Sequence, residues 1–177
     1  MMKHLIPFES IRSEYQKHGV KDYYTKHSND YKNPHSDKVE KCLDWCLSKI
    51  DIGYFLDLGC GDGVVSQYLR GRNILKFDGC DPHFKNIYQS KLNHTCYDLS
   101  FEDISKFGLE KKYDTIICSY SLHLCPKSYF NQLLYQLSTS CDNLVIISPS
   151  KYPIIDDYFN IVETNIIDRC HVRIFST

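Results

Sequence analysis

Two acidic residues bracket a run of glycines in a pattern that suits a ligand containing a ribose. Asp57 stands two residues before Gly59, and Gly59, Gly61 and Gly63 occupy alternate positions directly after an apolar run. Such glycines leave bare backbone at the end of a strand, and a following helix turns its positive end toward the same place. Asp81 lies 18 residues beyond Gly63, where a carboxylate can accept both ribose hydroxyls. The alternative is that the glycines only let a strand and a helix pack closely.

The residues inside the loop favour a cationic ligand over a dinucleotide. Dinucleotide sites carry a third Gly or Ala where this chain has Val64, because their pyrophosphate rests on the helix N-terminus. A nicotinamide-dependent oxidoreductase is therefore the weaker alternative. Asp57 and Asp62 would also repel a pyrophosphate. S-adenosylmethionine combines a ribose with a sulfonium and an ammonium, so the loop predicts this cofactor, with S-adenosylhomocysteine as its product.

Candidate catalytic side chains follow the apolar run at residues 113–118. Tyr120 and His123 stand there, next to Ser119. Methyl transfer from a sulfonium is a direct displacement, so holding the acceptor in line can suffice and a base is optional. His123 could take a proton near neutral pH. Alternatively, His123 lies in a half-buried turn and bonds a backbone carbonyl.

Four segments together resemble the class I S-adenosylmethionine-dependent methyltransferases: residues 57–63, 80–83, 100–104 and 113–123. The likeness extends over residues 37–177. It implies a seven-stranded sheet whose last two strands form an antiparallel hairpin. It also implies a role in cofactor binding for a set of residues, with Asp57 at the ammonium, Asp81 at the ribose and Phe101 on the adenine. The full set is Asp57, Gly59, Cys60, Gly61, Asp81, Pro82, Ser100, Phe101 and Ser119.

The elements that position these residues alternate along the chain. Apolar runs at 54–58, 74–80, 113–118 and 144–147 predict strands, and the stretches 64–70, 84–91 and 129–138 between them predict helices. A further helical pattern begins at Asp37 and is closed by Gly53. This alternation predicts a doubly wound, Rossmann-like α/β fold with a parallel sheet.

The C-terminal part follows a different pattern. Residues 159–167 and 170–175 are rich in β-formers, and the two residues between them cannot span a parallel crossover. They predict an antiparallel hairpin at the sheet edge. The segment 151–158 leaves room for a turn or two of helix, too little for a substrate-binding cap.

Residues 1–36 predict an N-terminal arm or lid that precedes a methyltransferase domain over 37–177. Tyr24, Tyr31 and His35 could reach the methionine end of the cofactor, where a carboxylate needs donors. The alternative is an arm packed permanently on the sheet.

Composition restricts the possible acceptors and the compartment. The 177 residues carry 21 Lys+Arg and 22 Asp+Glu, so no general basic field exists and a small molecule or a protein is favoured over RNA as the methyl acceptor. The nine cysteines suggest reduced thiols, and neither a signal peptide nor a membrane span is evident, so a cytoplasmic protein is expected. Cys42 and Cys46 have zinc-like spacing but no second pair, so no metal is predicted.

Two possibilities remain open beside an enzyme that acts alone. The chain could be a non-catalytic S-adenosylmethionine-binding module or the silent subunit of a complex. A partner protein could also supply substrate specificity.

Overall fold

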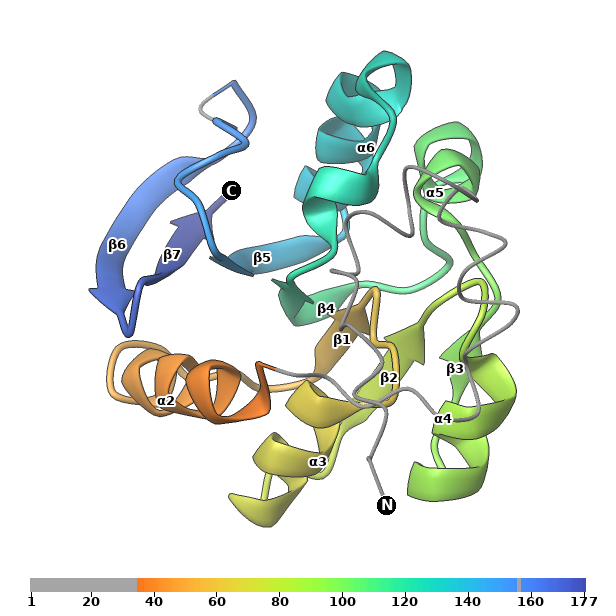
Figure 1. Ribbon diagram of the computed structural model, residues 1–177. Helices are drawn as coiled ribbons and strands as arrows, with labels where there is room; N and C mark the ends of the chain where they lie inside the picture. The colour runs from red at the N-terminus through yellow and green to blue at the C-terminus, as the bar shows by residue number, and fades with distance from the viewer. Residues whose placement is uncertain (1–34, 156) are drawn as a thin grey trace, which may run out of the picture.

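A twisted sheet of seven strands runs through the part of the chain that the computed structural model describes, residues 35–155 and 157–177 (Figure 1). The strand order is β3-β2-β1-β4-β5-β7-β6, and β7 runs antiparallel to both of its neighbours. The strands are β1 (Phe55–Leu58), β2 (Phe77–Cys80), β3 (Cys96–Tyr97), β4 (Tyr113–Ser119), β5 (Cys141–Ser148), β6 (Asn160–Ile167) and β7 (Cys170–Ser176). The helices are α2 (Ser36–Leu47), α3 (Val64–Gly71), α4 (Lys85–Leu92), α5 (Phe101–Phe107), the 3₁₀ helix η1 (Leu122–Leu124) and α6 (Lys127–Ser138).

Helices cover both faces of the sheet. Helices α2, α3 and α4 lie on one face and α5 and α6 on the other (Figure 1). Leu43 and Leu69 belong to a buried cluster with Val145, whereas Leu133 and Leu137 belong to a second cluster on the opposite face. All four residues of β1 are consequently buried, as expected for a central strand of a parallel sheet. The predicted doubly wound fold is confirmed.

The C-terminal hairpin is also confirmed. Strands β6 and β7 pair antiparallel, and β7 joins them to β5 with Val145 opposite Ile174. Asp168 and Arg169 form the connection, with φ of 49° and 65°. Two left-handed residues give the turn the twist that a two-residue hairpin requires.

Several predicted boundaries were wrong. Strand β2 begins at Phe77 rather than at residue 74, because its pairing with β1 begins there, opposite Phe55. Helix α2 ends at Leu47, well before Gly53, whose φ of +59° belongs to the turn that leads into β1. No described residue of the segment 151–158 is helical. Pro153 lacks the amide hydrogen that a helix interior needs.

Two elements were missed by the sequence prediction. Strand β3 has only two residues, too few for a periodic signal. Helix α5 is seven residues long and starts from a capping box, in which the Ser100 hydroxyl accepts from the Asp103 amide at 3.1 Å and the Asp103 carboxylate accepts from the Ser100 amide at 2.9 Å. The Ser-x-x-Asp spacing was therefore the available signal for this helix.

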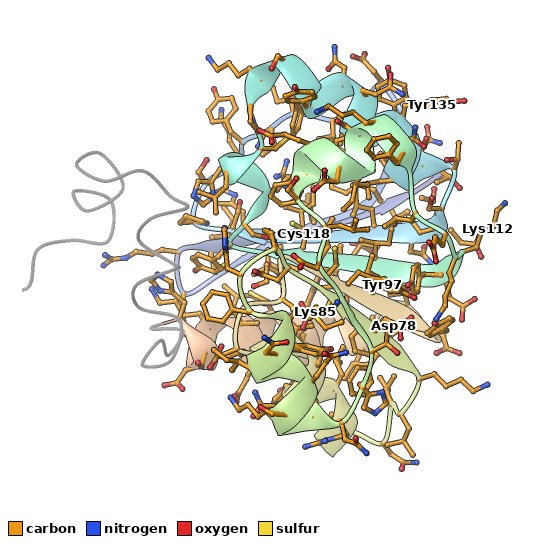
Figure 2. All side chains as sticks on the ribbon, turned by 90° about the vertical axis from the view of Figure 1, so that its right-hand side faces the viewer. Asp78, Lys85, Tyr97, Lys112, Cys118 and Tyr135 are labelled. Carbon is orange, nitrogen blue, oxygen red and sulfur yellow. The ribbon has the colours of Figure 1, made fainter. Side chains whose placement is uncertain are left out.

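A buried carboxylate stabilises the edge of the sheet at which the parallel strands begin. Asp78 is 5% exposed and accepts hydrogen bonds from the Tyr54 hydroxyl at 2.5 Å, the Lys111 ammonium at 3.0 Å and the Tyr113 hydroxyl at 3.1 Å. Asp78 and Tyr97 lie toward one end of the sheet and Cys118 toward the other (Figure 2). This network therefore stabilises the fold away from the edge where the glycine loop lies.

Candidate active site

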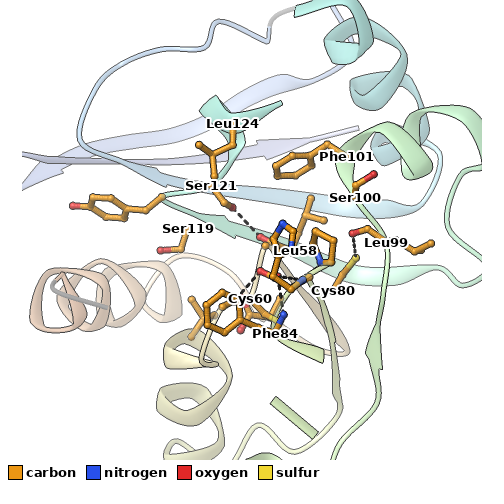
Figure 3. A pocket seen from close by; sticks show the side chains of 18 of the residues that line it. Leu58, Cys60, Cys80, Phe84, Leu99, Ser100, Phe101, Ser119, Ser121 and Leu124 are labelled. Carbon is orange, nitrogen blue, oxygen red and sulfur yellow. Dashed lines mark hydrogen bonds between the residues drawn. The ribbon is translucent and has the colours of Figure 1, made fainter. Parts of the chain in front are cut away.

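A cavity of about 610 Å³ opens where β1, β2 and β4 end (Figure 3). Its lining comes from segments far apart in the sequence: residues 57–62, 80–84, 99–103 and 119–121, with Val64, Val65, Leu124 and Pro126. The carboxyl ends of parallel strands meet at one edge, which is where ligands bind in open α/β sheets. The four motifs predicted from the sequence thus converge on one cavity.

The glycine loop has a backbone that admits no side chain at its first glycine. Gly59 has φ of +69°, and a Cβ built there would lie 2.6 Å from the Cβ of Ser121. The amides of Gly59 and Cys60 both donate to the Cys80 carbonyl, at 2.8 and 3.1 Å. The Ser121 hydroxyl in turn donates to the Leu58 carbonyl at 3.2 Å. These bonds fix the loop against β2 and against the residues that follow β4.

Asp57 lies beneath the loop and is only 1% exposed. Its carboxylate accepts from the Ser66 hydroxyl at 2.7 Å and from the Ser66 amide at 3.2 Å, so it satisfies an otherwise unpaired donor in the first turn of α3. Burial raises the pKa of Asp57 from 3.8 to about 7, although the two bonds from Ser66 act in the opposite direction.

We expect Asp57 to make the protein less stable as the pH rises from about 4 to 7. The folded protein then holds the Asp57 proton while the unfolded chain has released it, so the free energy of unfolding falls with pH and levels off above about 7. Asp57→Asn should remove a dependence on the order of 1–3 kcal/mol. Urea unfolding of both proteins at pH 4.5 and 7.5 measures it. Parallel pH dependences in the two proteins would contradict the assignment.

Asp81 joins the two loops of the site. One carboxylate oxygen accepts from the Gly61 amide at 3.1 Å, and the other accepts from the His83 and Phe84 amides at 2.8 and 3.1 Å. A carboxylate offers about four acceptor positions, so one remains for a ligand hydroxyl. Burial raises the pKa of Asp81, and these amide bonds counteract the rise.

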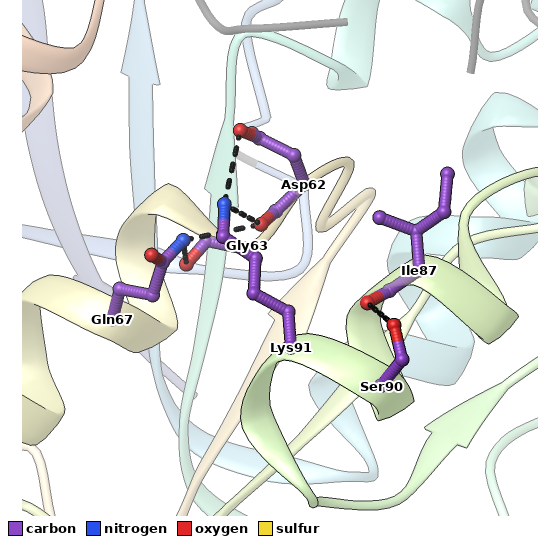
Figure 4. Close-up of polar contacts among 6 residues, drawn as sticks. All are labelled: Asp62, Gly63, Gln67, Ile87, Ser90 and Lys91. Carbon is purple, nitrogen blue, oxygen red and sulfur yellow. Dashed lines mark hydrogen bonds and ion pairs between the residues drawn. The ribbon is translucent and has the colours of Figure 1, made fainter. Parts of the chain in front are cut away.

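Asp62 is less repulsive to a ligand than its sequence position suggests. The ammonium of Lys91 on α4 lies 3.4 Å from the Asp62 carboxylate and 3.1 Å from the Asp62 carbonyl, and Gln67 donates to the same carbonyl at 3.1 Å (Figure 4). The pair ties the glycine loop to α4 and offsets part of the negative charge of Asp62.

Phe101 and Ser100 line the cavity at the start of α5. The Ser100 hydroxyl donates to the Asp103 carboxylate at 2.6 Å as part of the capping box. These bonds lower the pKa of Asp103, so that carboxylate is ionised at neutral pH. Phe101 is partly buried and presents an apolar ring, whereas the Ser100 hydroxyl is already engaged in capping the helix.

Ser119 is the last residue of β4 and Tyr120 follows it directly, and both line the cavity. The Ser119 hydroxyl oxygen is buried and makes no hydrogen bond within the described part of the chain. Tyr120 has φ of +54°, and its hydroxyl donates to the Cys170 thiol at 3.4 Å. The Tyr120 ring stacks on His35, with centroids 4.5 Å apart and planes 14° apart. His123 is exposed on η1 and is not part of the cavity lining.

Most of the predicted site residues therefore come together. Those that line the cavity are Asp57, Gly59, Cys60, Gly61, Asp81, Pro82, Ser100, Phe101, Ser119 and Tyr120. His35 contacts Tyr120, His123 lies outside the lining, and Tyr24 and Tyr31 lie outside the described residues. The lining residues Leu124 and Pro126 lie outside the four motifs and were not predicted, and their proximity to the fourth motif was the available signal.

Within residues 35–155 and 157–177, no group of three or more His, Cys, Asp or Glu side chains could hold a metal ion. Cys42 and Cys46 are fully buried in the core, where burial raises the pKa of Cys46 to about 12. The same part of the chain contains no helix with the length and apolar character needed to cross a membrane.

Known proteins share both the domain and the fold. Residues 55–142 match the family model described as a methyltransferase domain. The N-methyltransferase NodS from Bradyrhizobium japonicum, in complex with S-adenosylhomocysteine, is similar with a TM-score of 0.66 at 14% identity, over 82% of this chain and 88% of that chain. Magnesium protoporphyrin IX methyltransferase from Synechocystis, with bound S-adenosylmethionine, is similar with a TM-score of 0.64 at 18% identity, over 98% of each chain. The 16S rRNA methylase RmtB is similar with a TM-score of 0.63 at 14% identity, over 93% of this chain and 71% of that chain. The sequence has no match among curated proteins.

The chain has the fold of the class I S-adenosylmethionine-dependent methyltransferases. Within this fold, residues 55–142 form the segment that matches the methyltransferase domain model.

Proposed function

We propose that this protein transfers the methyl group of S-adenosylmethionine to a small molecule or a protein side chain. The charge of the cavity carries the proposal. Of its described lining residues, five are carboxylates and none is Lys or Arg; the carboxylates are Asp57, Asp62, Asp81, Glu102 and Asp103. Such a lining attracts the sulfonium and ammonium of the cofactor and repels the phosphates of RNA.

The cavity offers one group for each part of this cofactor. Asp81 has an acceptor position left for the ribose, with Pro82 beside it, and Phe101 provides a flat apolar surface for the adenine. The glycine loop allows close approach of the methionine part, and the unpaired Ser119 hydroxyl offers it a hydrogen bond. Asp57 would face the ammonium through the floor of the loop.

The bound cofactor would supply a methyl group that its positive sulfur has already activated. This chain would then hold the acceptor in line and exclude water. Tyr120 is the better placed of the two catalytic candidates, because its ring lines the cavity and is fixed by His35 and Cys170. His123 would act as a base only for an acceptor that reaches from the cavity to η1.

Incubation with methyl-labelled cofactor and fractionated cell extract tests the function. We expect label in metabolites or protein, and label in RNA would overturn the acceptor class. Tyr120→Phe and His123→Ala should keep their affinity for S-adenosylhomocysteine within about twofold. A base at His123 would show as turnover about 10²- to 10⁴-fold lower in the alanine variant.

The names of the similar structures leave the acceptor open, since they include an N-methyltransferase, a porphyrin methyltransferase and an rRNA methylase. The alternative is a non-catalytic binding module or a silent subunit. It would bind the cofactor and transfer label to nothing unless a partner protein were added. The same incubation, repeated with and without pulled-down partners, separates the two.

Two further parts of the proposal concern the N-terminus and the compartment. Residues 1–36 would form the arm or lid of the domain over 37–177, supported by the stacking of His35 on Tyr120. Unchanged cofactor affinity in a protein without residues 1–34 would contradict a lid.

The protein would be cytoplasmic, since all nine cysteines are free, even Cys60 and Cys96 with sulfurs 3.7 Å apart. Fractionation of cells that express a tagged chain tests this location.

A further inference from the structure

Beneath the glycine loop, three buried polar side chains from three different elements form one hydrogen-bonded chain. Asp57 belongs to β1 and lies at the floor of the cavity. Ser66 lies in the first turn of α3, and Tyr88 lies in the middle of α4. They are 1%, 0% and 0% exposed. The Ser66 hydroxyl is 2.7 Å from the Asp57 carboxylate and 2.6 Å from the Tyr88 hydroxyl.

The direction of these hydrogen bonds follows from the chemistry of the groups. An ionised carboxylate can only accept, so the Ser66 hydroxyl must donate its one proton to Asp57. The Ser66 oxygen then accepts from the Tyr88 hydroxyl. Burial, and next the nearby Asp57 charge, raise the pKa of Tyr88, so its hydroxyl keeps its proton at neutral pH and remains a donor. In this arrangement Tyr88 donates to Ser66 and Ser66 donates to Asp57, so the hydrogen atoms of both hydroxyls point toward the carboxylate.

The charges around Asp57 show why that help matters. Two nearby carboxylates, Asp81 and Asp62, act on Asp57 electrostatically, and both raise its pKa further. The Lys91 ammonium, which lies beside the glycine loop, is paired with Asp62. An ionised Asp57 thus depends on hydrogen bonds from Ser66, and on the Tyr88 hydroxyl behind it, to remain charged in a buried position.

We infer that Tyr88, acting through Ser66, is a positioning residue that orients Asp57 and keeps it ionised to receive the ammonium group at the amino acid end of the cofactor. The inference rests on the proposed function. It assigns a binding role to a residue that has no contact with the cavity. It also connects α4, which follows the ribose-binding loop, with the loop that holds the methionine part.

A packing role for Tyr88 is the competing explanation, because its ring also fills space under two glycines. A Cβ built on Gly63 would lie 3.2 Å from the ring, and one built on Gly79 would lie 2.6 Å from its Cζ. Tyr88→Phe separates the two roles, since it keeps the ring and removes only the hydroxyl. Ser66→Ala interrupts the same chain from the other side and leaves Tyr88 in place.

The experiment measures affinities by calorimetry for S-adenosylmethionine, S-adenosylhomocysteine and 5′-methylthioadenosine, which lacks the amino acid part. We expect Tyr88→Phe and Ser66→Ala to weaken the first two ligands about 5- to 30-fold and to change the third less than twofold. The pH at which S-adenosylhomocysteine binding reaches half of its full strength should also move upward, because Asp57 loses donors that favour its charged form.

Tyr113→Phe is the matched control, because it removes a buried tyrosine hydroxyl from a carboxylate at the opposite edge of the sheet. It should change none of the three affinities. Equal weakening of all three ligands by Tyr88→Phe, or no weakening at all, would overturn the inference. A wild-type protein that binds none of the three would instead overturn the proposed function.

Discussion

Asp81→Asn should weaken S-adenosylhomocysteine binding by about 30- to 150-fold, which corresponds to roughly 2–3 kcal/mol. A ribose hydroxyl would lose a charged acceptor. In addition, the NH₂ group of the asparagine cannot accept a hydrogen bond. In one orientation of the side chain the bond from the Gly61 amide is lost, and in the other orientation the bonds from the His83 and Phe84 amides are lost. Both loops of the site would therefore loosen together. Isothermal calorimetry measures the affinity, and an unchanged value would mean that the ribose lies elsewhere.

Asp78→Asn is the control that separates binding from stability. It makes the same substitution at a buried carboxylate in the strand that leads to Asp81, but at the opposite edge of the sheet. It disturbs hydrogen bonds from Tyr54, Lys111 and Tyr113 and should lower the free energy of unfolding by about 1–3 kcal/mol. Affinity for the cofactor should stay within about twofold. A large loss of affinity here would show that general loosening, rather than ribose contact, explains the Asp81 result.

Gly59→Ala should combine a loss of stability with a loss of cofactor affinity. A residue with a side chain at φ of +69° is strained, and the added Cβ would lie 2.6 Å from that of buried Ser121. We expect the free energy of unfolding to fall by about 2–4 kcal/mol, which lowers the melting temperature by roughly 5–15 °C. The loop must also move, so affinity should fall at least about tenfold. Thermal melts and calorimetry measure the two effects.

A double-mutant cycle divides the Gly59 effect into its two causes. In a Ser121→Gly background the collision is gone and only the backbone strain remains, so Gly59→Ala should cost less stability there. Gly71→Ala is the matched control, because nothing lies within 4 Å of the Cβ it would add in α3. That substitution should be neutral or stabilising by about 0.5–1 kcal/mol. An equal loss of stability in both backgrounds would show that the Ser121 side chain moves aside without cost.

Much of the fold could be predicted because its signals are local. Apolar runs bounded by Gly, Pro and Asn define the strands, and the Asp168–Arg169 link fits only a hairpin. The main failures came where a segment is too short for periodicity, as in the two-residue β3, or where a cap was the signal, as at Ser100. The start of β2 failed for another reason, since it depends on pairing with Phe55 in a different strand.

The candidate site could be predicted to the extent that its residues lie in motifs. Asp57, Gly59 and Asp81 were found by spacing, and they line the same cavity. The hydrogen-bond partners of these residues could not be found in this way. Ser66 and Tyr88 are 22 positions apart and meet only because α3 and α4 pack on the same face of the sheet. The pairing of Lys91 with Asp62, which offsets a charge counted as repulsive, has the same origin.

The close fit between Gly79 and Tyr88 has an evolutionary consequence. Because the ring occupies the space where a side chain at position 79 would stand, these two positions share one volume across the boundary between β2 and α4. Neither can change size alone without forcing the other to move. In an alignment of homologous sequences, an aromatic residue at position 88 should occur together with glycine at position 79. Larger residues at 79 should occur with small ones at 88, so that the pair covaries as a unit.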